Sequence, residues 1–182
     1  MKISPVQHSY PRLLAELLSA TAARLPDKEA LVFHDQRVRW SEFNRRVDHL
    51  AKAFLKMGIK RGDRIGVIST TRPEYLYTYL AAARIGAVPV GFGILYTPTE
   101  LVRLAQLTRP VVMVVLGKLA DKDLAASLKP VFDALSFVRH FIVIDDQAPD
   151  GALPFGDLID ADFADQNVAL TARKAELDEN DP

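Results

Sequence analysis

The chain has 182 residues, 49% of them hydrophobic and 25% charged, which is typical of one globular domain with its own core. Its 23 basic and 23 acidic residues leave no cationic excess, so we expect no nucleic-acid partner. It has no cysteine for disulfides or thiolate metal sites, and its first twelve residues lack the apolar core of a signal peptide. We therefore expect a cytoplasmic protein.

The N-terminal third predicts a helix, a β-hairpin and a second helix. Pro11 suits the first turn of a helix whose leucines recur along one face. The runs EALVFHD and RVRW then predict two antiparallel strands around a turn at Asp35-Gln36. Ser41 is the expected N-cap of the second helix, and Gly58 suits the left-handed residue that follows its end.

From residue 63 onward, short apolar runs alternate with helical segments. The near-continuous apolar strands and the intervening helices predict a β-α-β-α-β-α-β unit, an α/β fold with a parallel sheet and helices on both faces. The crossovers should be right-handed. The expected strands cover 63–69, 87–91, 111–116 and 137–145.

Three helices are expected between these strands. Thr71 with Glu74, and Thr97 with Glu100, have the spacing of a capping box, so each threonine is expected to begin a helix. The third helix should cover about 119–135.

The apolar stretch 76–95 has the length of a membrane span but a different pattern. Arg84 lies inside it, and one proline and three glycines interrupt it. We therefore predict a buried helix followed by a buried strand, and no transmembrane segment.

The whole of 1–182 is expected to form one subdomain. Residues 10–62 hold the leading helix, the hairpin and the second helix, and residues 63–145 hold the parallel core. Residues 146–182 lose the alternation and predict a loop, a short helix near 155–163 and a linker.

In a parallel sheet, ligands bind beyond the carboxyl ends of the strands. The candidate segments are therefore Ser69–Arg72, Gly91–Tyr96, Leu116–Lys118 and Asp145-Asp146. None of them matches a dinucleotide-binding or P-loop motif.

Each of these segments has a plain structural alternative. Ser69–Thr71 could offer hydroxyls to a phosphate, although capping a helix is the commoner role of Thr71. Asp145-Asp146 could bind a cation or a ribose, although most such pairs belong to solvated loops. The four histidines have no metal-ligand spacing and no catalytic triad is apparent, so we predict no metal site and no catalytic residue.

Three stretches together resemble the N-terminal part of the AMP-forming acyl-CoA synthetases. They are VRWSEFNRRVDHLAKAFLKMGIKRGDRIGVIS (38–69), RPEYLYTYLAAARIGAVPV (72–90) and LYTPTEL (95–101), and the resemblance covers most of 10–145. The third stretch is similar to a run in bacterial fatty-acid CoA ligases, so a fatty acid is the favoured carboxylic acid substrate. The family pattern is broken at Gly91–Ile94, which puts the contacts of that loop in doubt.

The resemblance implies a two-step reaction. A carboxylate attacks the α-phosphate of ATP, with Mg²⁺ supporting the charge, and releases pyrophosphate. The thiol of coenzyme A then displaces AMP from the acyl-adenylate. ELDENDP (176–182) is similar to the linker that precedes the phosphate loop in this family. The chain is thus expected to be a fragment that lacks the phosphate loop and the catalytic lysine, and to be inactive alone.

Within the chain, the resemblance places Gly93, Ile94 and Leu95 near coenzyme A. Two other readings stay open. One is a complete flavodoxin-like module that binds a phosphate at Ser69–Arg72, although that loop has no glycine. The other is an interaction domain that forms homo-oligomers through exposed apolar surface.

Overall fold

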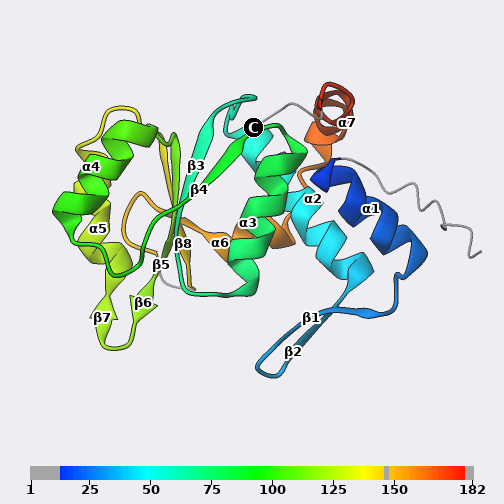
Figure 1. The fold of residues 1–182 in the computed structure, drawn as a ribbon, viewed down its shortest axis with the longest axis horizontal. Coiled ribbons are helices and arrows are strands. Elements are labelled where there is room, and N and C mark those ends of the chain that lie inside the picture. Colours follow the sequence, from blue (N-terminus) through cyan, green and yellow to red (C-terminus); the bar gives the residue numbers. More distant parts are fainter. Residues whose placement is uncertain (1–12, 146–147, 179–182) are drawn as a thin grey trace, which may run out of the picture.

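The computed structural model of the chain describes residues 13–145 and 148–178. Its centre is a five-stranded sheet in the order β4-β3-β5-β8-β9, and every neighbouring pair is parallel (Figure 1). The predicted α/β fold is confirmed. The strands are β3 (Arg64–Ile68), β4 (Val88–Gly91), β5 (Val112–Leu116), β8 (His140–Ile144) and β9 (Leu153–Pro154).

Helices cover both faces of the sheet, which explains why the strands are continuously apolar. All five residues of β5 are buried. Val114 packs into the core on one face, while its neighbour Val115 packs into the core on the other face. This alternation follows from the opposite directions of successive side chains in a strand.

The first face carries most of the helices. Its core joins the sheet to side chains from five helices, including Leu18, Phe54, Tyr77, Phe155 and Leu170. These helices are α1 (Leu14–Arg24), α2 (Trp40–Lys56), α3 (Pro73–Arg84), α6 (Phe155–Asp160) and α7 (Asn167–Ala175). On the second face lie α4 (Pro98–Thr108) and α5 (Leu124–Asp133), which place Leu101 and Phe132 in the second core.

The N-terminal elements are confirmed with two corrections. Strands β1 (Glu29–Phe33) and β2 (Gln36–Arg39) form the hairpin, but its turn is at His34-Asp35 rather than Asp35-Gln36, with His34 left-handed at φ 50°. Ser41 does not cap α2, whose N-cap is Arg39. The N–H groups of Trp40 and Ser41 instead donate to the carbonyls of Lys28 and Pro26, in the loop between α1 and β1, so no side-chain cap is needed there.

The two predicted capping boxes have different outcomes. Thr97 and Glu100 form theirs in full at the start of α4. Thr71 does not cap α3, because the helix begins later, at Pro73, with Arg72 as N-cap. Glu74 bonds the guanidinium of Arg72 instead of reaching back to a backbone N–H, with Nε and Oε2 3.2 Å apart.

The helix predicted over 119–135 is shorter than expected. Two short strands, β6 (Lys118–Leu119) and β7 (Lys122–Asp123), form a ribbon before α5 begins at Leu124. The carbonyl of Gly117 accepts from the N–H groups of Leu124 and Ala125, which fixes the start of the helix against the end of β5. Asp123 caps α5 by accepting from the N–H of Ala126 at 2.8 Å.

The C-terminal part holds more structure than the sequence predicted. Helix α6 confirms the short helix near 155–163, but β9, the 3-10 turn η1 (Ala164–Gln166) and α7 were not predicted. The proposed helix start at Pro11, residue Asp146 and the end of the linker (179–182) lie outside the described residues.

The stretch 76–95 forms most of α3, a turn and β4, as predicted. Gly86 makes that turn with φ 67°. Among the helices of the described ranges, none combines the length and hydropathy needed to cross a membrane.

Candidate functional site

The carboxyl edge of the sheet brings the candidate segments together. Strand β3 lies between β4 and β5, so the chain passes to one side of β3 and then returns to the other. This reversal makes a switch point beyond the ends of β3 and β5, where open α/β sheets bind ligands. Ser69–Arg72, Gly91–Tyr96, Leu116–Lys118 and Asp145 follow the four longer strands and all lie at this edge.

The loop after β3 combines an uncapped helix with a buried hydroxyl. No side chain caps α3, so the hydroxyl of Thr71 does not act as the predicted N-cap. The Ser69 hydroxyl oxygen is buried and makes no hydrogen bond within the described part of the chain. Arg72 is engaged by Glu74 and lies 6.0 Å from the centre of the Phe33 ring.

The loop after β4 is a tight turn that projects from the sheet. The Phe92 N–H donates to Val67 O at 2.8 Å, and the Tyr96 N–H donates to Gly93 O at 3.1 Å. A Cβ at Gly93 would lie 2.9 Å from the Tyr96 ring, so a larger residue would displace that ring. Leu95 at the tip is 86% exposed, whereas Ile94 packs against both cores. The segment thus presents backbone and the exposed side chains of Leu95 and Tyr96 at the carboxyl edge.

A hydrogen bond joins the segments that follow β5 and β8. The Asp145 carboxylate accepts from the Lys118 N–H at 2.8 Å. A Cβ at Gly117 would lie 2.8 Å from the Asp145 Cβ, so glycine permits this close approach. Asp145 is therefore bound to the backbone of Lys118. Asp146, the second residue of the predicted acidic pair, lies outside the described residues.

Histidines and acidic residues do not gather into a metal centre within the described ranges. His34 packs edge-on against Phe33, and the His140 Nε2 lies 3.2 Å from Met57 O. His49 is buried in a polar cluster described below, and His8 lies outside the described ranges.

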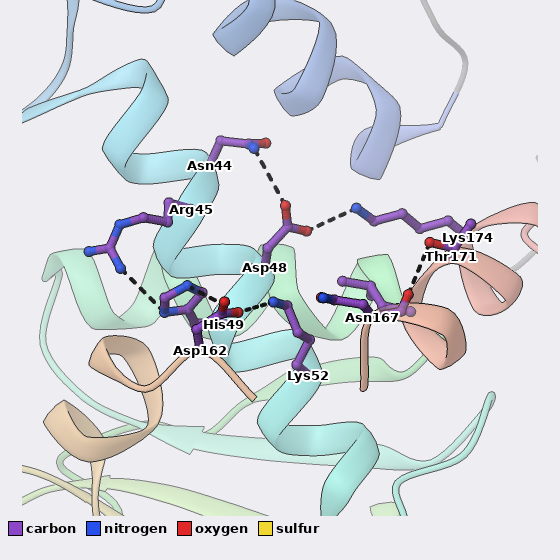
Figure 2. Close-up of a pocket in the computed structure, with 10 residues that line it drawn as sticks. Asn44, Arg45, Asp48, His49, Lys52, Asp162, Asn167, Thr171 and Lys174 are labelled. Atoms are coloured by element: carbon purple, nitrogen blue, oxygen red, sulfur yellow. Dashed lines mark hydrogen bonds and ion pairs between the residues drawn. The ribbon is translucent and has the colours of Figure 1, made fainter. Parts of the chain in front are cut away.

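A second candidate is an open polar pocket of about 550 Å³ between α2, α7 and the loop after α6 (Figure 2). Asn44, Asp48 and Lys52 recur every four residues along α2, so they share one face of that helix. From α7, Thr171 and Lys174 complete the opposite wall. Reasoning from sequence missed this pocket because α7 was not predicted, although the spacing on α2 was visible.

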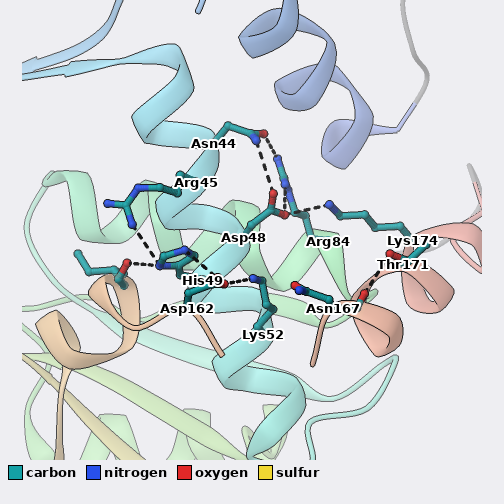
Figure 3. A network of polar contacts seen from close by, with 11 residues as sticks. Asn44, Arg45, Asp48, His49, Lys52, Arg84, Asp162, Asn167, Thr171 and Lys174 are labelled. Atoms are coloured by element: carbon teal, nitrogen blue, oxygen red, sulfur yellow. Dashed lines mark hydrogen bonds and ion pairs between the residues drawn. The ribbon is translucent and has the colours of Figure 1, made fainter. Parts of the chain in front are cut away.

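Asp48 is the centre of this pocket's ion pairs (Figure 3). Its carboxylate contacts the guanidinium of Arg84, which is fully buried, and Lys174 Nζ at 2.9 Å. Asn44 joins them by accepting from Arg84 Nη2 at 2.6 Å. Burial of Asp48 raises its pKa, but the charges of Arg84 and Lys174 outweigh burial, so the pKa lies below its usual value.

Asp162 anchors the other half of the network. Lys52 pairs with its carboxylate, and His49 Nε2 lies 3.6 Å from the same oxygen. The hydrogen bond from Lys52 is the main reason that the pKa of Asp162 is lowered. His49 Nδ1 also lies 3.0 Å from Ile159 O. These contacts tie α7 and the loop after α6 to α2 and α3.

Comparison with known proteins identifies the family of the chain. The model of the family described as "AMP-binding enzyme" matches residues 18–182. The chain is 39% identical over 90 residues to acyl-CoA ligase sidI of Aspergillus fumigatus, a match covering 48% of this chain and 15% of that protein. It is 32% identical over 96 residues to the mitochondrial medium-chain acyl-CoA ligase ACSF2 of Bos taurus, covering 52% and 16%.

The comparison with solved structures also finds an enzyme that forms an acyl-CoA. Acetoacetyl-CoA synthetase from Streptomyces lividans superposes with a TM-score of 0.74 and 26% identity, covering 82% of this chain and 25% of that one. The chain thus spans only about a sixth of the two curated relatives and a quarter of this structure.

Proposed function

Because the chain belongs to the AMP-binding enzyme family, we propose that it forms the N-terminal part of an AMP-forming acyl-CoA ligase. The match of the family model to residues 18–182 carries this proposal. The acyl-CoA ligases among its relatives support the choice of reaction within the family.

The proposed reaction uses ATP, Mg²⁺ and coenzyme A. A carboxylate oxygen bonds to the α-phosphorus of ATP as pyrophosphate leaves. The sulfur of coenzyme A then bonds to the acyl carbon, the bond to AMP breaks, and the thiol proton is released. The sequence contains no glycine-rich phosphate loop, so residues 1–182 are expected to be inactive alone and to form one wall of the active site.

Within this chain, we assign Gly93, Ile94 and Leu95 to the vicinity of coenzyme A. The turn lies at the carboxyl edge, and its tip residue Leu95 is 86% exposed, so it is accessible to a ligand. The tight contact between Gly93 and the Tyr96 ring holds the turn in place. These residues would position the cofactor and take no part in bond formation.

The test is exchange of labelled pyrophosphate into ATP, which reports adenylation without coenzyme A. Residues 1–182 would be compared with a longer protein that contains them, each with a panel of carboxylic acids. We expect exchange only from the longer protein, with fatty acids as the best substrates. Turnover by residues 1–182 would refute the inactive fragment, and no exchange by the longer protein with any acid would refute the ligase.

The stand-alone alternative makes a different prediction. A flavodoxin-like module that bound a flavin phosphate at Ser69–Arg72 would purify as a yellow protein. A colourless chain that binds no flavin on titration would exclude this module.

A further inference from the structure

The amino edge of the sheet, opposite the candidate site, is strongly basic although the whole chain is neutral. The strands begin along the upper side of Figure 1, and the β6–β7 ribbon marks the carboxyl side below. Five basic residues and one acidic residue lie in the turns that lead into β3, β5 and β8 or at the first residue of β3. We call them the amino-edge patch: Lys60, Arg61, Asp63, Arg64, Arg109 and Arg139.

Backbone hydrogen bonds set the basic residues side by side. The Val111 N–H donates to Arg64 O, and the Arg139 N–H donates to Val111 O, each at 2.8 Å. The starts of β3, β5 and β8 are therefore adjacent, and neighbouring strands lie about 5 Å apart. Arg64, Val111 and Arg139 therefore lie in line across the sheet edge, and Arg109 lies two residues before Val111.

Asp63 offsets part of this positive charge. It binds one member of the patch, with Arg139 Nη2 2.9 Å from its Oδ2, and also accepts from the Lys60 N–H. Asp133, in the last turn of α5, is already paired with Lys129 at 2.6 Å. The patch therefore keeps an excess of positive charge that attracts anions at moderate salt.

Arg109 is exposed, so its guanidinium is accessible to an anionic partner. Arg64 is less accessible, because its Nε is buried and its Nη1 reaches Gly62 O at 3.3 Å. The guanidinium of Arg109 lies 4.6 Å from the centre of the Phe137 ring, which supports it at the surface.

An apolar side chain projects beside these charges. Leu107 lies in the last turn of α4, two residues before Arg109, and is 80% exposed. Basic residues combined with a protruding apolar side chain are typical of surfaces that rest on lipid headgroups. An acidic peptide would match the charge but would give Leu107 no apolar environment.

We propose that the amino-edge patch docks on an anionic lipid surface, with its basic residues on the headgroup phosphates and Leu107 at the acyl boundary. In this orientation the carboxyl edge, with its candidate cofactor turn, faces away from the lipid. The proposal goes beyond the ligase function and does not depend on it.

The test is co-sedimentation of the chain with vesicles of phosphatidylcholine alone or mixed with phosphatidylglycerol. We expect binding only to the anionic vesicles, weakening as salt is raised. The double variant Lys60→Gln/Arg109→Gln should bind about 30-fold more weakly, because each basic residue near such a surface contributes about a factor of five. A control with the same charge change, Lys28→Gln/Lys122→Gln, removes exposed bases elsewhere and should bind within about twofold of the unaltered chain.

A third variant separates lipid from other polyanions. Leu107→Gln should weaken vesicle binding but leave any binding to soluble polyglutamate unchanged. Equal binding to neutral and anionic vesicles, or equal losses in the double variant and its control, would overturn the proposal. If Leu107→Gln has no effect and polyglutamate binds as tightly as vesicles, the partner is an acidic polypeptide and the lipid assignment is wrong. Thermal unfolding of each variant checks that the fold is intact.

Discussion

Arg84 has no exposed surface, so its charge depends entirely on the groups that surround it. Asp48 provides the opposite charge and Asn44 accepts a further hydrogen bond. A buried cation that loses its partner is costly, whereas the complete pair is close to neutral for stability. Asp48 is therefore the residue of this network whose removal should destabilise the protein most.

We predict that Asp48→Asn lowers the free energy of unfolding by about 2–4 kcal/mol, because it leaves Arg84 buried without a counter-charge. Chemical denaturation followed by circular dichroism measures the change. Asp162→Asn is the matched control, since Asp162 also pairs with a lysine of α2 but has 61% of its side chain exposed. Its loss should be clearly smaller, and equal losses for the two variants would contradict the role given to Arg84.

Glu42 gives a prediction about acid stability. The hydrogen bond from Arg45 lowers its pKa to about 2, against an opposing effect of burial and with help from Arg46. A carboxyl whose pKa is lowered by folding stabilises the protein above its unfolded pKa, near 4.3, and loses that contribution as pH falls towards 2. Unfolding free energies measured between pH 5 and about 2 should thus fall less steeply for Glu42→Gln than for the unaltered chain. Parallel curves would show that Glu42 is not held in this way.

At the scale of the element, the two capping-box sequences show what decides where a helix begins. Both have the same sequence spacing, yet only Thr97 accepts the N–H of the residue three positions on. Pro follows Thr97 directly, so α4 starts there, whereas Arg72 intervenes before the proline at the start of α3. The position of the proline in the sequence therefore distinguishes the start of α3 from the start of α4.

This difference predicts the effect of two matched substitutions. Thr97→Ala should destabilise the protein by about 1 kcal/mol, because it removes the cap of α4. Thr71→Ala should leave stability within experimental error, because Thr71 is exposed and caps nothing in the structure. Thermal unfolding of both variants measures this, and a loss at Thr71 equal to that at Thr97 would show that α3 starts earlier than described.

Other elements show where sequence patterns are sufficient and where they are not. Strand β5 was predictable because buried strands of a parallel sheet are apolar throughout. Helix α7 was not, because Leu170 is its single buried residue and it is held by polar contacts such as Lys174 with Asp48. The start of α5 was also hidden, since the carbonyl of Gly117 fixes it from outside the helix. Periodicity reports burial, so elements held by polar or distant contacts escape it.

At the scale of the molecule, the carboxyl edge was predictable and the polar pocket was not. Alternating strands and helices were enough to place Ser69–Arg72 and Gly91–Tyr96 at one edge. The pocket needs α2, α7 and the loop after α6 to meet, and that contact joins residues more than a hundred positions apart. No local pattern encodes such a contact.

The apolar surface of the first face leads to a prediction about assembly. A pocket of about 340 Å³ lies between α1, the hairpin and α3, lined by side chains that include Leu18, Trp40 and Phe43. Three large apolar side chains that line it are each 39–43% exposed: Leu14, Leu17 and Leu76. Contiguous exposed apolar surface of this kind favours association.

We therefore predict that the chain forms homo-oligomers through this pocket as its concentration is raised. Leu17→Gln/Leu76→Gln places polar groups on both sides of the pocket and should shift the chain towards monomer in sedimentation equilibrium. Val168→Gln is the control, because Val168 is 83% exposed but lies on α7, whose residues do not line this pocket. Association that weakens equally in the control, or a chain that stays monomeric at every concentration, would show that this surface does not pair with a second copy.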